Sequence, residues 1–144
     1  MELRGLIKEV LENGFLMSLG TVDEGGVWVA DVTYIFDDNF NIYWMSDPEV
    51  RHSKAILNNK QVAGTITVSW DKDRELGLQF SGEVEKIDGN RYDLALKHCA
   101  KRGKPEPAEN DDVLEGDSWY VLKPKFFELI NGQLFGFEKQ KYEL

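Results

Sequence analysis

The stretch WMSDPEVRHSK at residues 44–54 gathers groups that can carry positive charge directly after a predicted strand. The groups in it that can carry positive charge fall within four positions: Arg51, His52 and Lys54. Ser46 and Pro48 are residue types that begin helices, and a helix N-terminus offers unpaired N–H groups and the positive end of the helix dipole. An arginine can bind two phosphate oxygens through parallel N–H bonds, and a serine hydroxyl can donate a further bond. The stretch therefore predicts a site for a terminal phosphate.

A second interpretation of the same stretch stays open. It is a capped surface helix whose cations pair with Asp47, with Glu49 or with solvent. The chain as a whole carries a formal charge of -9. Such a surface repels phosphate backbones, so no nucleic-acid partner is expected and any anion site must be built locally.

Length and composition predict one domain over residues 1–144. The chain has 144 residues, of which 42% are apolar and 12% aromatic, and this is enough to bury one sizeable core. Acidic residues interrupt the N-terminal apolar stretches, and no apolar run approaches the roughly 18 residues of a membrane span. We expect no signal peptide and no membrane association. The single cysteine, Cys99, permits no internal disulfide and favours the cytoplasm.

Other constellations predict little chemistry. His98 and Cys99 are neighbours on a predicted helix, where adjacent side chains point about 100° apart, so they do not form a Cys–His nucleophile. We expect His98 to be exposed and Cys99 to be buried. Two histidines and one cysteine without a recognised spacing predict no metal site. Neither a GxGxxG nor a Walker A motif occurs, and no catalytic acid or base can be assigned.

The apolar periodicity predicts a mainly β protein with two or three helices. The predicted helices cover residues 2–13, 46–59 and 88–102. The predicted strands cover residues 15–22, 27–36, 40–45, 61–70, 76–87, 118–130 and 133–140. The first three strands are joined by short turns and predict a three-stranded meander. Six or seven antiparallel strands would form a small β-barrel most economically, since closure removes exposed edges.

Glycine and proline mark expected irregularities in these strands. Gly77 and Gly82 predict bulges or bends in the strand 76–87, and Pro124 predicts an edge or a break in the strand 118–130. Asn131 and Gly132 predict a turn before the last strand. Residues 71–75 and 103–117 are polar and are expected to be surface loops.

The hairpin of strands 27–36 and 40–45 leads directly into the cationic stretch. A planar ring lying across it could take hydrogen bonds from main-chain groups of residues 31–35, which carry no side-chain signature. An ordinary hairpin without a ligand is the alternative. Most of the aromatic residues are expected in the core or at a subunit interface.

The order of these features resembles the pyridoxamine 5'-phosphate oxidase-like family of FMN-binding split β-barrels. The segments that carry the resemblance are LGTVDEGG, ADVTYIF, YWMS, RHSKAI and GLQFSGEVEKI. Within the family the chain looks most like a small bacterial, YhbP-like subgroup that shares RH, VAGT and QF-x-GE, with a late element seen here as LFGFEK. The resemblance is strongest over residues 5–90. The C-terminal Arg and His pattern that binds the vitamin phosphate in the true oxidases is not seen, which favours bound FMN over vitamin oxidation.

The resemblance implies a six- to seven-stranded antiparallel split β-barrel that forms a homodimer with FMN sites at the subunit interface. It further implies an FMN-dependent oxidoreductase whose small-molecule substrate is not identified. The phosphate would be held by Ser46, Arg51 and His52, with Lys54 nearby. The implied contacts with the rest of the flavin are the main chain of Val32, Thr33 and Tyr34, the side chain of Met45 at the ribityl chain, and Gln79 and Trp119 at the ring.

Two other functions stay open beside this one. The same barrel could hold flavin, haem or another planar ligand without turnover. It could also be a plain structural dimer with no ligand.

Overall fold

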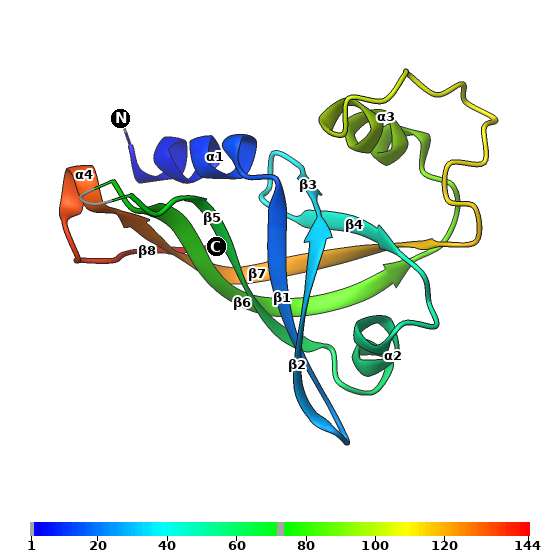
Figure 1. Ribbon diagram of the computed structural model, residues 1–144, viewed down its shortest axis with the longest axis horizontal. Helices are drawn as coiled ribbons and strands as arrows, with labels where there is room; N and C mark the ends of the chain where they lie inside the picture. Colours follow the sequence, from blue (N-terminus) through cyan, green and yellow to red (C-terminus); the bar gives the residue numbers. More distant parts are fainter. Residues whose placement is uncertain (1, 72–73) are drawn as a thin grey trace.

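One curled antiparallel sheet forms the body of the protein (Figure 1). The computed structural model describes residues 2–71 and 74–144. Within these ranges there are eight strands: β1 (Leu16–Asp23), β2 (Gly26–Thr33), β3 (Ile35–Phe36), β4 (Ile42–Ser46), β5 (Gln61–Ser69), β6 (Leu76–Ile87), β7 (Ser118–Asn131) and β8 (Gln140–Glu143). The helices of the same ranges are α1 (Leu3–Asn13), α2 (Arg51–Asn58), α3 (Tyr92–Lys101) and α4 (Gly132–Phe135).

The strand order is β2-β1-β5-β6-β7-β4-β3, with β8 on β7 beyond β4. The two ends of this path, β2 and β3, are consecutive in the chain and are separated by a single residue, Tyr34. The sheet therefore curls until its first and last strands meet at one connection, as a split barrel requires. The predicted fold class is confirmed, with one strand more than the six or seven expected.

The predicted three-stranded meander is wrong, because Tyr34 interrupts the strand expected over residues 27–36. β2 pairs with β1, whereas β3 pairs with β4 through only two residue pairs. The Tyr34 ring is fully buried, and its hydroxyl donates to the carbonyl of Leu11 in α1 at 2.8 Å. At this contact the chain leaves β2, at one end of the strand order, and enters β3 at the other end.

Register shifts occur at both predicted glycines, but the extra residue lies in the neighbouring strand each time, Val68 of β5 and Lys125 of β7, and not in β6. The register of β6 on β7 shifts between Ser81 and Gly82, and Gly82 lies opposite Pro124. A Cβ on Gly82 would collide with the Lys123 carbonyl, so only glycine fits there. Pro124, which has no N–H to donate, also falls where the outer neighbour of β7 changes from β4 to β8. A further shift separates Thr67 from Ser69 opposite the start of β6, next to Gly77.

α2 begins at Arg51 rather than at residue 46. Ser46 stays in β4, where it pairs with Ser118 of β7, so it cannot cap the helix. The expected capping box of Ser46 and Glu49 is therefore not formed. Instead Asp47 closes a turn by accepting a bond from the Glu49 amide at 2.9 Å. α1 agrees closely with its predicted range, and α3 is shorter than predicted at its N-terminal end.

The C-terminal prediction is wrong in detail. Asn131 caps the short helix α4 by accepting a bond from the Leu134 amide at 3.0 Å, so the segment does not form a hairpin turn. The last strand lies at Gln140–Glu143 and not at 133–140. Residues 72–73 of the predicted loop 71–75 lie outside the described residues.

The core fills the inside of the curl. Trp44 stacks on Tyr120 at 5.9 Å between ring centroids, and Phe127 meets Phe40 and Phe80 edge to face. α1 packs near β5, β6 and β8, and α2 packs on β1 and β2. A separate small cluster binds α3 to the barrel through Ile35, Leu94, Ala95 and Trp119.

α3 belongs to an excursion between two neighbouring strands. Ile87 at the end of β6 pairs with Trp119 at the start of β7. The intervening chain, residues 88–117, leaves the sheet after Ile87 and returns to it at Ser118, the residue before Trp119. It carries α3 to the β3 side of the barrel (Figure 1).

Candidate functional site

The turn between β4 and α2 brings two of the predicted phosphate ligands together. The Ser46 hydroxyl lies 3.1 Å from Nε2 of His52, and the tautomer of the ring decides which of the two donates. Partial burial lowers the pKa of His52, which favours the neutral form of its ring. No side chain among the described residues caps this end of α2, because the capping position holds Val50. The first N–H groups of α2 thus remain available as donors beside Ser46 and His52.

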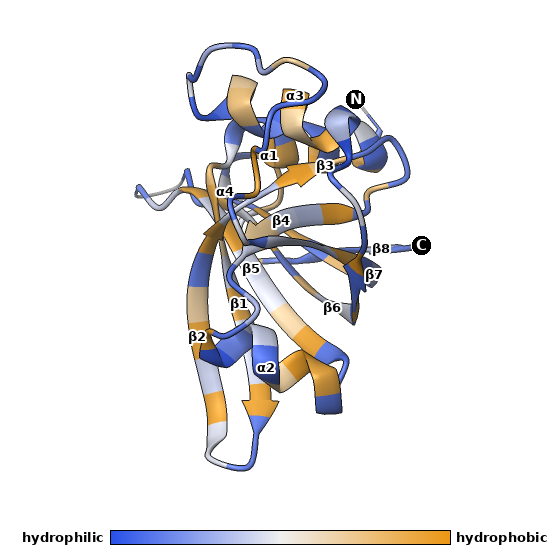
Figure 2. Ribbon diagram, turned by 90° about the vertical axis from the view of Figure 1, so that its right-hand side faces the viewer, coloured by the Kyte–Doolittle hydropathy of each residue, from blue (hydrophilic) through white to orange (hydrophobic). Residues whose placement is uncertain are grey.

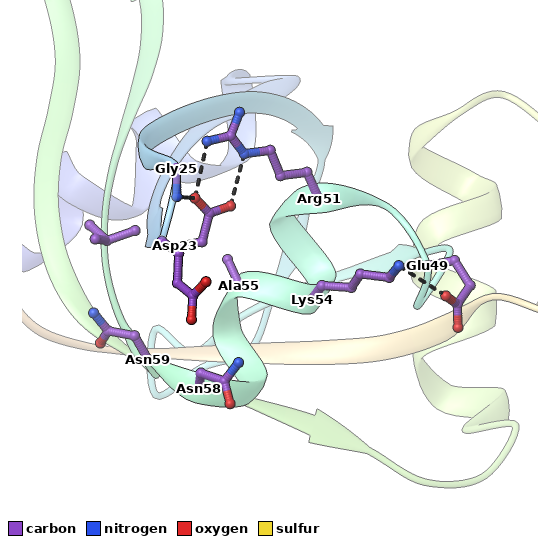
Figure 3. Close-up of a pocket in the computed structure, with 10 residues that line it drawn as sticks. Asp23, Gly25, Glu49, Arg51, Lys54, Ala55, Asn58 and Asn59 are labelled. Carbon is purple, nitrogen blue, oxygen red and sulfur yellow. Dashed lines mark hydrogen bonds and ion pairs between the residues drawn. The ribbon is translucent and has the colours of Figure 1, made fainter.

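Arg51 reaches back to the hairpin of β1 and β2 (Figure 3). Its Nε and Nη2 donate to the two carboxylate oxygens of Asp23 at 2.8 and 3.0 Å. The Trp28 ring covers its guanidinium at 4.4 Å. The hydrogen bonds with Arg51 lower the pKa of Asp23 and raise that of Arg51. Sequence reasoning missed Asp23 and Trp28. The strand period could have placed them on the inward face with buried Met17 and Leu19, had the position of α2 been known.

Lys54 pairs with Glu49 at 3.3 Å, and both side chains are largely exposed. This matches part of the alternative interpretation, in which the cations of the stretch pair with local acids. Arg51 also pairs with an acid, but with Asp23 of another element rather than with Asp47 or Glu49.

An open groove separates the hairpin from α2, with a volume of about 1150 Å³. Arg51 and Lys54 line it together with three acids: Asp23, Glu24 and Glu49. Figure 3 shows Asn58 and Asn59 at the far end of α2 in the same groove. The groove is therefore polar and of mixed charge, and its cations are already partnered.

The segment predicted to meet a planar ring, around residues 31–35, is bound by two lysines of α3. Lys101 donates to the Tyr34 carbonyl at 2.6 Å, and Lys97 donates to the Phe36 carbonyl at 3.3 Å. Burial lowers the pKa of Lys101 to about 8. Val32 and Thr33 lie in β2, where they pair with β1, and the Val32 side chain is buried.

Met45 and Trp119 are cross-strand partners in β4 and β7. The Trp119 side chain is fully buried, and its Nε1 donates to the Asn90 carbonyl at 2.9 Å. Gln79 lies elsewhere, in a hollow of about 330 Å³ that also contains Thr65, Thr67 and Trp70. A single chain thus distributes the predicted residues over three places. These are the α2 N-terminus, the β2–β3 connection under α3 with Met45 and Trp119 in the adjoining cluster, and the outer face of β6.

His98 is buried and not exposed as predicted, with 3% of its surface accessible. Its ring meets Trp119 edge to face at 5.6 Å between centroids, because it lies on the face of α3 that packs on the barrel. Burial, with a smaller contribution from Arg102 and Lys101, lowers the pKa of His98 to about 4. Cys99 is buried, as predicted.

The outer face of β2, β1 and β5 carries few charges for a protein with 30% charged residues. Strand register places Val29, Gly20, Ala63 and Ser81 in one row across this face. The next row holds Asp31, Ser18, Thr65 and Gln79, and the Ser18 hydroxyl donates to Asp31 at 2.6 Å. Val27 and Val29 are 74% and 60% exposed. Figure 2 shows apolar residues along the projecting part of β1 and β2.

Across residues 2–71 and 74–144, no group of three or more His, Cys, Asp or Glu side chains is placed to hold a metal ion. In the same ranges, none of the helices has the length and apolar character needed to span a membrane.

The curled sheet with its helix after β4 defines a split β-barrel protein. A family model described as pyridoxamine 5'-phosphate oxidase matches residues 3–125, and the chain belongs to this family. It is similar to the UPF0306 protein YhbP of Salmonella paratyphi A, with 34% identity over 95 residues that cover 58% of this chain and 62% of that protein.

Solved structures of low sequence identity share the fold. The conserved hypothetical protein Rv2991 of Mycobacterium tuberculosis superposes with a TM-score of 0.83 at 12% identity, over 97% of this chain and 91% of that one. A haem-binding protein of Mycobacterium smegmatis superposes with a TM-score of 0.75 at 13% identity, over 99% of this chain and 58% of that one.

Proposed function

We propose that the protein is a homodimeric FMN-binding flavoprotein that acts as an oxidoreductase on a small molecule. The observation that carries the proposal is the convergence of donors at the start of α2. The Ser46 hydroxyl and the His52 ring lie 3.1 Å apart beside the uncapped helix end, and Arg51 begins the same helix. Hydroxyl, imidazole, guanidinium and main-chain N–H groups are the donors that bind a phosphate monoester. The residues present therefore fit the phosphate end of FMN.

The remaining predicted contacts are supported less directly. The peptide groups of Val32, Thr33 and Tyr34 and the side chain of Met45 would face the flavin, and Gln79 and Trp119 would contribute from the ring side. FMN supplies the redox chemistry when it is bound, so the proposal assigns no catalytic acid or base to the chain. What the chain contributes is anchoring of the phosphate, orientation of the ring and exclusion of water.

The dimer is proposed from the outer face of β2, β1 and β5. Val27 and Val29 expose an apolar surface there, and small residues in β1 and β5 leave the face flat enough for close approach. Apolar exposure of this kind, bordered by polar side chains, is typical of an association surface. Within one chain, Gln79 lies apart from the predicted phosphate ligands at the α2 N-terminus. A second copy on this face would bring the residues of its own outer face to the site.

A non-catalytic haem binder is the second candidate, supported by the fold shared with the M. smegmatis protein. Haem iron needs an axial ligand such as His, Cys, Met or Tyr. Both histidines of the chain are engaged in the structure: His52 with Ser46, and His98 buried against Trp119. These contacts favour flavin over haem as the ligand.

The expected compartment, a reducing cytoplasm, remains a prediction that rests on the single cysteine.

An absorption spectrum of the freshly purified protein separates the two ligands, since flavin absorbs in the blue and haem gives a Soret band. Titration with FMN and with riboflavin then tests the phosphate site, and FMN is expected to bind more tightly. Anaerobic mixing with NAD(P)H tests turnover, because a reductase bleaches the flavin. Equal affinity for FMN and riboflavin would contradict the proposed site. A colourless protein that FMN does not stabilise against heat would contradict the proposed function.

A further inference from the structure

The Arg51 guanidinium already binds a carboxylate with the geometry that it would use for phosphate. Its Nε donates to Oδ2 of Asp23 at 2.8 Å, and its Nη2 donates to Oδ1 at 3.0 Å. Paired N–H bonds of this kind are how arginine recognises both carboxylate and phosphate groups. Asp23 therefore occupies the two donors that an incoming phosphate would need.

The turn between β1 and β2 holds this ion pair in place. The Gly25 amide donates to Oδ1 of Asp23 at 2.8 Å, which fixes the carboxylate. A Cβ on Gly25 would lie 2.9 Å from Nη2 of Arg51, so the turn approaches the guanidinium closely because it has glycine there. Trp28 covers the guanidinium. Figure 3 shows Asp23 between Gly25 and Arg51, joined to both.

The ion pair is nevertheless open to exchange. The side chains of Arg51 and Asp23 are 38% and 26% exposed, and water screens ion pairs that it can reach. A phosphate monoester carries about -1.5 to -2 charges near pH 7, compared with one on a carboxylate. A phosphate can therefore replace Asp23, whereas another carboxylate gains nothing by doing so.

We propose that Asp23 is an internal competitor for the phosphate of the ligand, and that the β1–β2 turn is released from α2 when phosphate binds Arg51. This inference rests on the proposed function, whose phosphate site includes Arg51. Competition by Asp23 lowers the apparent affinity of Arg51 for every anion by the same factor. Free phosphate, which is held by few contacts, then leaves the site largely empty, whereas a ligand with further contacts, as FMN would have, still binds.

The test compares two variants of equal charge change in the same groove. Asp23→Asn keeps the shape of the side chain and its bond from the Gly25 amide, but removes the carboxylate. Glu24→Gln removes a neighbouring charge that has no contact with Arg51 among the described residues. FMN and riboflavin are titrated into both variants and into the wild type. Asp23→Asn is expected to bind FMN about two- to fivefold more tightly than Glu24→Gln, the range that a solvent-accessible ion pair allows. Riboflavin affinity is expected to be unchanged.

The outcomes separate the two proposals. A wild type that prefers FMN to riboflavin, with no gain in Asp23→Asn over Glu24→Gln, overturns the competition alone. A wild type without that preference overturns the phosphate site, and the competition with it. An equal gain for FMN and riboflavin in Asp23→Asn also overturns the competition, because the effect then does not act through phosphate.

A measurement on the wild type keeps the inference testable if Asp23→Asn does not fold. Amide hydrogen exchange is followed in peptides that cover residues 20–28, with FMN and with riboflavin as the added ligand. FMN is expected to raise exchange in the turn relative to riboflavin, since only FMN would displace Asp23. Equal or lower exchange with FMN contradicts release of the turn.

Discussion

Lys101 of α3 binds both the main chain and the side chain of Tyr34. Its Nζ donates to the Tyr34 carbonyl at 2.6 Å and lies 3.3 Å from the centroid of the Tyr34 ring. Tyr34 is the residue at which β2 gives way to β3, and its hydroxyl is held by Leu11 of α1. Two helices thus fix the one residue that joins the ends of the sheet.

Replacing this lysine is expected to loosen the connection. Lys101→Met keeps the aliphatic stem but loses the charged hydrogen bond and the cation–π contact. The same change removes the desolvation cost that lowers the pKa of Lys101, so the expected net loss in the free energy of unfolding is at most about 1 kcal/mol. Urea denaturation measures it. Lys97→Met is the matched control on the same helix, because its bond to the Phe36 carbonyl is longer, at 3.3 Å, and exposed. A similar loss in both variants would mean that Lys101 has no special role at Tyr34.

Acid is expected to destabilise the protein through His98. Its pKa is about 4 in the folded chain, below the ordinary value of 6.5, so the unfolded chain binds more protons between these pH values. The stabilising contribution is complete above about pH 6.5 and is lost as the pH falls toward 4, by roughly 3 kcal/mol in all. Denaturation midpoints at several pH values measure this loss. His98→Gln is expected to flatten the curve over the same window.

An NMR titration checks the assignment directly. The chain has two histidines, so their ring signals are readily separated. The His98 signal is expected to shift only near pH 4, below the window in which an exposed histidine titrates. Titration of His98 near pH 6.5 would contradict its buried position.

The outer face can be tested with a charge. Val29→Lys places an ammonium in the row that also holds Gly20 and Ala63, and is expected to convert the proposed dimer into a monomer. Val29 is 60% exposed in one chain, so the free energy of unfolding of the monomer should change by less than about 0.5 kcal/mol. Sedimentation velocity measures the mass. Leu57→Lys on α2 is the control, since Leu57 is similarly exposed and lies away from this face. A Val29→Lys dimer as tight as the wild type would place the interface elsewhere.

Ser46 and His52 are expected to act together on the ligand phosphate. Ser46→Ala and His52→Ala should each weaken FMN by about 0.5–1.5 kcal/mol, the usual range for a hydrogen bond, with little change for riboflavin. Because the two side chains are in contact, the double variant should lose less than the sum of the single losses. Isothermal titration calorimetry of the wild type, the two single variants and the double variant measures these losses. Strict additivity would show that the contact does not operate in the complex.

Local patterns predicted much of the fold. The helix over 2–13, the strands at 61–70 and 76–87, and the irregularity at Gly82 and Pro124 follow from periodicity and from the missing Cβ and N–H groups. The failures occur where a distant partner decides. Tyr34 ends a strand because α1 and α3 bind it, although its neighbours alternate as a strand should.

Strand pairing also explains why α2 begins later than the sequence predicts. Ser46 has the sequence of a helix cap but remains in the ladder with Ser118, a partner that no local pattern reveals. The candidate site divides in the same way. Arg51, His52 and Lys54 were visible as a local cluster, whereas Asp23 required knowledge of how α2 packs on the hairpin. The separation of Trp119 and Gln79 from that cluster is likewise a property of the folded chain.

The excursion of residues 88–117 is separable from the strand ladder of the barrel. Since Ile87 and Trp119 are neighbours across the ladder, a short turn could join them without altering the rest of the register. The segment is then a separable unit whose two ends join the sheet at neighbouring positions and whose helix α3 packs on the β2–β3 connection at Tyr34. Its replacement by shorter or longer versions offers a route by which the cover over Tyr34 could vary during evolution while the barrel stays constant.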